Sequence, residues 1–194
     1  MPHLFAHRCC RESRQNLFYT KAGDSIIYSA GAVGVKLSGL SRDAEKTQQF
    51  ANDHTDKITA LAVHHESKSM TYVATGQVGL VPKINVWTSH TMENKVVLVG
   101  VHKVGVCQLD FSPSGKLLVS VGMDVYHSIA VYDWQAKAAV FTSVTTMQPV
   151  LDARWLDEEN FSTCGQNHVY FWSRSGQVFK RQRGLFGKKV SSRV

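Results

Sequence analysis

The chain has 194 residues, of which 43% are apolar, 10% aromatic and 19% charged, and its formal net charge is +7. That apolar fraction suffices for a packed core, which excludes a fully disordered chain, and the length suits one ordinary domain or two small ones. No run approaches the roughly 18 consecutive apolar residues of a membrane-spanning helix, and the first dozen residues lack the apolar core of a secretory signal, so we expect neither a membrane segment nor export.

Residues 1–16 are predicted to form a basic segment. His3, His7, Cys9 and Cys10 could be imagined as metal ligands, but no second ligand pair stands at zinc spacing, so we expect no metal site. The four cysteines show no C-x-x-C spacing, which favours a reducing cytoplasm over a disulfide framework.

Residues 17–50 are predicted to form one unit of four short strands. The strands are LFYT, SIIYSA, VGVKL and TQQF in chain order. Gly23 and Asp24 make a turn between the first two strands, and Gly31 and Gly34 permit a close backbone approach or a bulge. The unit therefore has the size and strand number of one propeller blade.

Three repeated units follow, over residues 51–101, 102–146 and 147–182. In each unit a middle strand ends in glycine, and these glycines (Gly76, Gly122 and Gly165) are spaced 46 and 43 residues apart. An aromatic residue closes each third strand, at Trp87, Tyr132 and Trp172, with spacings of 45 and 40. Two independent markers thus indicate one period in the low-to-mid forties.

The repeated segments have the pattern of β-strands. They are short, rich in β-branched and aromatic residues, and bounded by Gly, Ser, Asp or Pro. FSPSGK (111–116) places Pro113 and Gly115 in a tight hairpin turn. Strands such as ITALAV and VYFW are apolar on both faces, which is expected where each sheet is sandwiched between neighbours. The predicted fold is all-β, with about four β-propeller blades.

Residues 183–194 are predicted to be a basic tail or a connector. The last 21 residues carry seven basic side chains and no acidic one, whereas residues 1–173 carry 15 of each sign. Basic ends on a neutral body indicate an acidic partner surface or a solvated segment. The candidate partner-binding residues are Lys180, Arg181, Arg183, Lys188 and Lys189, followed by Arg8, Arg11 and Arg14.

The repeats resemble the WD repeat. In the second unit His102, Ser120, Asp124 and the pair Tyr132–Asp133 match that family's histidine, hydroxyl, turn aspartate and closing dipeptide. The resemblance implies a buried hydrogen-bonded chain with a structural role. The first unit keeps His54 and Trp87, and the third keeps Trp172, but Thr88 and Ser173 replace the closing aspartate and Asn167 lies near the turn position. We therefore expect weaker networks in the first and third units.

The upstream segment extends the likeness to a particular family. Residues 10–37, the string VATGQVG (73–79), and SVGMD, VYDWQ and RGLFGK further on resemble the hydrophobic motif and first WD repeats of the echinoderm microtubule-associated-protein-like family. The resemblance covers about residues 7 to 189. It implies tubulin or microtubules as the partner, and a cytoplasmic, cytoskeletal setting that includes the cilium or axoneme.

Four blades are too few for a full ring, since seven blades of about 43 residues need on the order of 300 residues. Three alternatives stay open: a fragment of a larger propeller, a split propeller that another chain completes, or an unusually small closed ring. An unclosed propeller leaves apolar sheet faces without neighbours.

No motif indicates an enzyme. The G-x-S-x-G, P-loop and H-E-x-x-H patterns are absent from the sequence, so we predict no catalytic residue and no cofactor. The expected function is microtubule binding, which modulates assembly or decorates the lattice. The alternative is a scaffold for protein assembly without direct tubulin contact. Nucleic acid is not expected as a partner, because few aromatic residues lie among the basic ones.

Overall fold

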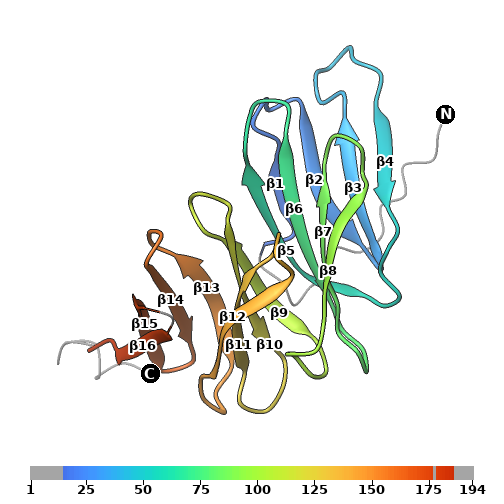
Figure 1. Ribbon diagram of the computed structural model, residues 1–194. Helices are drawn as coiled ribbons and strands as arrows, with labels where there is room; N and C mark the ends of the chain where they lie inside the picture. The colour runs from blue at the N-terminus through green and yellow to red at the C-terminus, as the bar shows by residue number, and fades with distance from the viewer. Residues whose placement is uncertain (1–14, 177, 186–194) are drawn as a thin grey trace.

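The computed structural model describes residues 15–176 and 178–185, and every regular element in these ranges is a β-strand (Figure 1). Sixteen strands form four antiparallel sheets, each made of four strands consecutive in the chain. The all-β prediction is confirmed, and the regions around Val73, Val119 and Tyr170 are strands as expected. Within the described ranges no helix exists that could cross a membrane.

The first two sheets occupy the N-terminal half of the chain. One contains β1 (Leu17–Tyr19), β2 (Ser25–Ala30), β3 (Val33–Ser38) and β4 (Thr47–Ala51). The next contains β5 (Ile58–His65), β6 (Thr71–Gln77), β7 (Ile84–Thr88) and β8 (Asn94–Leu98).

The other two sheets follow the same order. The third contains β9 (Val106–Phe111), β10 (Leu117–Gly122), β11 (Ser128–Asp133) and β12 (Ala138–Val144). The fourth contains β13 (Val150–Trp155), β14 (Asn160–Gly165), β15 (His168–Ser175) and β16 (Val178–Arg183). The outer strands β8, β12 and β16 carry no repeat marker in the sequence, because they are paired on one side and exposed at many positions.

Short turns join neighbouring strands within each sheet. Between β9 and β10 the N–H of Gly115 donates to Ser112 O at 2.8 Å, and Gly115 has a φ of +72°. This left-handed conformation is the one that glycine adopts without strain. The predicted turn around Pro113 and Gly115 therefore lies where the sequence places it.

The core consists of three apolar layers between successive sheets. Between the first and second sheets, Trp87 and Val73 pack with Ile27 and Ala51. A Cβ on Gly34 would lie 2.7 Å from Trp87 Cζ2, so only glycine allows the first sheet to approach the indole this closely. Larger layers join the second sheet to the third and the third to the fourth.

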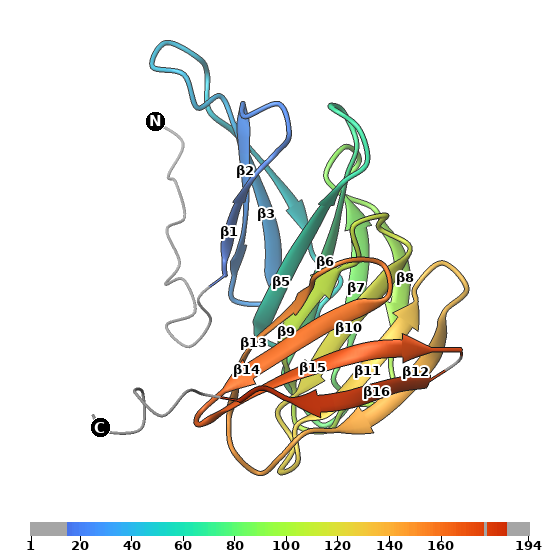
Figure 2. The ribbon, with the colours of Figure 1, turned by 90° about the vertical axis from the view of Figure 1, so that its left-hand side faces the viewer.

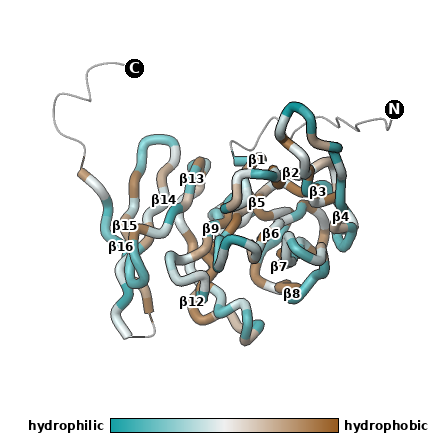
Figure 3. The backbone as a smooth tube through the Cα atoms, turned by 90° about the horizontal axis from the view of Figure 1, so that it is seen from above, coloured by the Kyte–Doolittle hydropathy of each residue, from teal (hydrophilic) through white to brown (hydrophobic). Residues whose placement is uncertain are grey.

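The four sheets form an open arc. Figure 3 shows them side by side in chain order, from β1–β4 to β13–β16, and Figure 2 looks onto the free side of the last sheet. The two middle sheets are covered on both faces, whereas the first and last sheets are each covered on one. The small closed ring is therefore wrong, and the fold is an incomplete propeller.

Candidate functional site

The third sheet contains a hydrogen-bonded chain centred on His102, which precedes β9. His102 Nε2 lies 2.5 Å from Ser120 Oγ, and His102 Nδ1 lies 2.8 Å from Ser128 Oγ. Ser128 in turn donates to the carboxylate of Asp124, and Ser120 hydrogen-bonds Tyr132. These residues come from a loop, a turn and two strands. The hydrogen-bonded network therefore links the loop before β9 and the turn after β10 to the two middle strands of the sheet.

Burial sets the protonation of this network. Desolvation lowers the pKa of His102 to about 4, against a smaller opposing effect of Asp124, and it raises the pKa of Tyr132 to about 12. Both groups are therefore neutral at pH 7. Asp133 lies outside the network, because its carboxylate accepts from the N–H of Ala136 in the following turn.

The second sheet builds a related network with a different acceptor. His54 Nε2 lies 2.7 Å from Thr75 Oγ1, to which Trp87 Nε1 also donates at 3.2 Å. His54 Nδ1 lies 2.8 Å from Gln77 Oε1, so an amide stands where the third sheet has hydroxyl and carboxylate groups. Burial again lowers the pKa of His54. The first WD unit thus keeps a network through residues that its motif did not identify.

The fourth sheet retains a shorter network. Trp172 Nε1 donates to Thr163 Oγ1 at 3.1 Å, and His168 Nδ1 lies 3.1 Å from Gln166 O at the turn. Sequence reasoning missed the partners Thr75, Gln77, Ser128 and Thr163. A signal was available for two of them: Thr75 and Thr163 are hydroxyl residues one or two positions before the repeated glycines Gly76 and Gly165.

The three described basic candidates lie in strand β16, and the strand divides them between its two faces. Arg181 stacks on the ring of Tyr170 at 4.7 Å and donates to Thr145 O at 3.0 Å, and Arg183 donates to Asn167 O at 3.4 Å. Lys180 pairs with Ser173 on the opposite, uncovered face. Lys180 and Arg181 fall in the range assigned to the third WD unit, and Arg183, the first residue of the predicted tail or connector, is the last residue of β16. Outside the described residues lie the other candidates, Lys188, Lys189, Arg8, Arg11 and Arg14.

The two uncovered sheet faces differ in chemistry. On the first sheet, register places Leu17, Tyr28, Val35 and Phe50 on one face. Leu17 and Phe50, together with Tyr19 on the same side, are exposed (Tyr19 by 61%), whereas Val35 is buried. On the last sheet the free face is mostly polar: it presents Arg154, Ser162, Gln182, Ser173 and Lys180, with Phe171 as an apolar member. The apolar face of β1–β4 is thus the stronger surface for contact with another chain.

We expect the 194-residue chain to self-associate through this face in a concentration-dependent manner. The double substitution Tyr19→Lys and Phe50→Lys should weaken association about tenfold or more, because it places charge on the exposed apolar surface. Sedimentation equilibrium measures the mass. The matched control is Val81→Lys with Leu156→Lys, two exposed apolar positions in loops. Equal masses for wild type and both variants would contradict the prediction.

The described residues hold no group of three or more His, Cys, Asp or Glu side chains that could bind a metal. Burial raises the pKa of the Cys107 thiol to about 12, which makes it a poor nucleophile. The acidic run Asp157 to Glu159 lies in the exposed β13–β14 turn, where Glu158 accepts from Ser114 and Asp157 accepts from Asn160. These groups have structural partners.

The family model of the first β-propeller of the echinoderm microtubule-associated protein matches residues 47–194. The chain belongs to this family. Mouse echinoderm microtubule-associated protein-like 2 is 34% identical across 92% of the chain, and human echinoderm microtubule-associated protein-like 4 is 32% identical across 92%. The chain spans 28% and 19% of the length of these two echinoderm microtubule-associated proteins.

The structure of the U3-55K protein has the same fold, with a TM-score of 0.69 and 19% identity. The similarity covers 93% of this echinoderm microtubule-associated protein family member and 55% of the U3-55K chain. The two proteins thus share an architecture.

Proposed function

We propose that the chain is a non-enzymatic, microtubule-binding WD-repeat module that acts in the cytoplasm on the microtubule cytoskeleton. The observation that carries this proposal is the match of the family's first propeller to residues 47–194, supported by relatives that are named for microtubule association. The networks around His54, His102 and Trp172 are largely buried and stabilise individual blades. The surface that contacts the microtubule is therefore sought among exposed residues. An axonemal or ciliary lattice is one setting for this binding.

The exposed side chain of Lys180 and the basic residues that follow it in the sequence support the proposal. Lys180 is exposed on the uncovered face of the last sheet, and Lys188 and Lys189 follow it in the sequence. Arg181 is less suited, because its guanidinium already packs on Tyr170 and binds backbone carbonyls. Attraction between exposed charges is screened by salt, so the binding is expected to be salt-sensitive.

The test is co-sedimentation with microtubules at low and high salt. Deletion of residues 180–194 would remove most of β16, so we choose the point variant Lys180→Glu, Lys188→Glu, Lys189→Glu. It should weaken binding about fivefold to tenfold, which corresponds to about 0.3–0.5 kcal/mol for each of the three exposed charge contacts. The control, Lys46→Glu, Lys68→Glu, Lys116→Glu, makes the same charge change elsewhere. A folded chain that fails to pellet at low salt contradicts direct binding.

The alternative is a protein-assembly scaffold without direct tubulin contact. It is supported by the two uncovered sheet faces, which can each accept another protein. Capture of partners by a chain that does not pellet with microtubules would favour it. Equal retention on a nucleic acid of similar charge density would instead indicate general polyanion binding by the basic residues.

A further inference from the structure

Strand β12 is an outer strand without the charges that usually protect a sheet edge. It is the longest outer strand, with seven residues, and residues 138–149 contain no charged side chain. By comparison, β8 contains Lys95 and β16 contains Lys180, Arg181 and Arg183, whereas β4 (TQQFA) also lacks a charge but has only five residues. Unprotected edges present free N–H and C=O groups to which another strand can pair.

The register identifies which backbone groups of β12 face outward. Ser128 lies opposite Val144, but the N–H of Ser128 donates to Asp124, and Val144 O accepts from Arg181 of the next sheet. Ser128 and Val144 are therefore a non-hydrogen-bonded pair of the antiparallel ladder. Because such pairs alternate, Thr142, which lies opposite Ala130, is the next one. Its N–H and C=O thus point away from β11.

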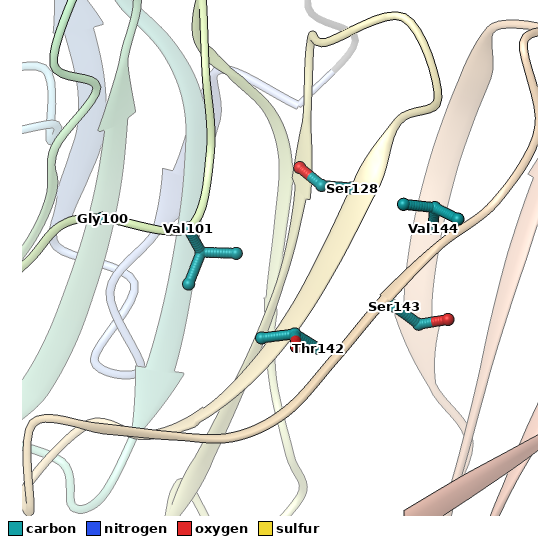
Figure 4. A pocket seen from close by; sticks show the side chains of 6 residues that line it. All are labelled: Gly100, Val101, Ser128, Thr142, Ser143 and Val144. Atoms are coloured by element: carbon teal, nitrogen blue, oxygen red, sulfur yellow. The ribbon is translucent and has the colours of Figure 1, made fainter.

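A cavity of about 500 Å³ lies beside this edge. Figure 4 shows Val101 facing β12 across the cavity, with Ser143 pointing away from it. A strand added to β12 would project alternate side chains over this space. Main-chain pairing with a side-chain pocket is the usual basis of peptide recognition at a sheet edge. The lining residues are Gly100, Val101, Ser128, Thr142, Ser143 and Val144.

Positive charge stands at both ends of the uncharged edge. Lys137 immediately precedes β12, and Arg181 donates to the carbonyls of Val144 and Thr145 at the other end of the strand. The N–H groups of Arg181 that bind these carbonyls are engaged, but the residue is exposed, so it contributes its charge to this end of the edge. Neither Lys137 nor Arg181 forms an ion pair within residues 15–176 and 178–185. If β12 paired antiparallel with the same strand of a second copy, Lys137 of one copy would approach Arg181 of the other, which is unfavourable. A peptide with acidic ends matches the same charges favourably.

We propose that the outer edge of β12 binds an extended peptide segment of a partner protein as a fifth strand of this sheet. The segment has an uncharged, β-branched centre that places one side chain in the cavity, and an acidic residue at each end. This interaction is independent of the proposed microtubule binding. It uses β12 instead of β16, and its partner is an extended peptide instead of the microtubule lattice.

The probe is the fluorescein-labelled peptide EVTVSE, with the reverse-charge peptide KVTVSK as its control. Fluorescence anisotropy should show KVTVSK binding about tenfold more weakly, since like charges then meet at both ends. The variant Thr142→Pro removes the outward N–H and leaves the β11–β12 ladder bonds, so EVTVSE affinity should fall about tenfold. Thr142→Ala keeps the N–H and should bind within about twofold of wild type.

Hydrogen exchange tests the same site without a substitution. The Thr142 amide should exchange about tenfold more slowly when EVTVSE is bound, whereas the Ser143 amide, already paired within the sheet, should change little. Unchanged exchange at Thr142, or equal EVTVSE affinity for folded Thr142→Pro, would overturn the proposal. Self-association that Thr142→Pro abolishes, without peptide binding, would assign the edge to a second copy and likewise overturn it.

Discussion

Replacing Trp172 with alanine is expected to lower the free energy of unfolding by about 3–5 kcal/mol, the range for removing a large aromatic side chain from a packed core. Trp172 is 2% exposed, stacks on Phe161 at a centroid distance of 5.5 Å, and donates to Thr163. The substitution opens a cavity between the third and fourth sheets and leaves Thr163 without its indole partner. Urea denaturation followed by circular dichroism measures the change.

The adjacent residue Phe171 is the matched control. It lies on the other face of β15 and is 43% exposed, so Phe171→Ala should change stability by no more than about 1 kcal/mol. Similar losses for Phe171→Ala and Trp172→Ala would mean that the last sheet is covered on both faces. The comparison therefore tests the open end of the propeller directly.

Acidification is expected to destabilise the protein through His102. Its folded-state pKa is about 4, below the value of 6.5 in the unfolded chain, so between these values the unfolded chain binds the proton more readily. The stabilisation is complete above pH 6.5 and is lost as the pH falls toward 4. The two pKa values differ by about 2.5, so at about 1.4 kcal/mol for each pKa unit the full loss is about 3–3.5 kcal/mol. His54, whose pKa is also lowered, adds to it in the same direction.

The variant His102→Asn isolates this contribution. It should be less stable than wild type at pH 7, yet its free energy of unfolding should depend less on pH between 6.5 and 4. His90→Asn, a substitution in the exposed β7–β8 loop, should keep the wild-type pH dependence. An unchanged slope in His102→Asn would show that the buried histidine does not couple folding to pH.

Much of the blade architecture follows from local pattern. The glycines at or next to the ends of β6, β10 and β14 and the aromatic residues of β7, β11 and β15 recur because every blade packs against its neighbours in the same way. His102, Ser120, Asp124 and Tyr132 could be grouped in advance because they match the positions of the WD repeat, and this resemblance implies a shared hydrogen-bonded network. By contrast, Gln77 of the second sheet was not predicted, since an amide in place of the usual acceptor becomes evident only beside His54.

The repeat and the all-β class are properties that the amino-acid order alone determines, because periodic apolar strands need neighbours on both faces. The family was evident from the sequence for a different reason, the resemblance of its motifs. The roles of individual exposed residues depend on which face each strand presents. Arg181 and Lys180 are adjacent basic residues in the sequence, but pleating directs one onto Tyr170 and the other into solvent. The open ends of the arc and the unprotected edge of β12 likewise arise from how the sheets pack, which no single segment specifies.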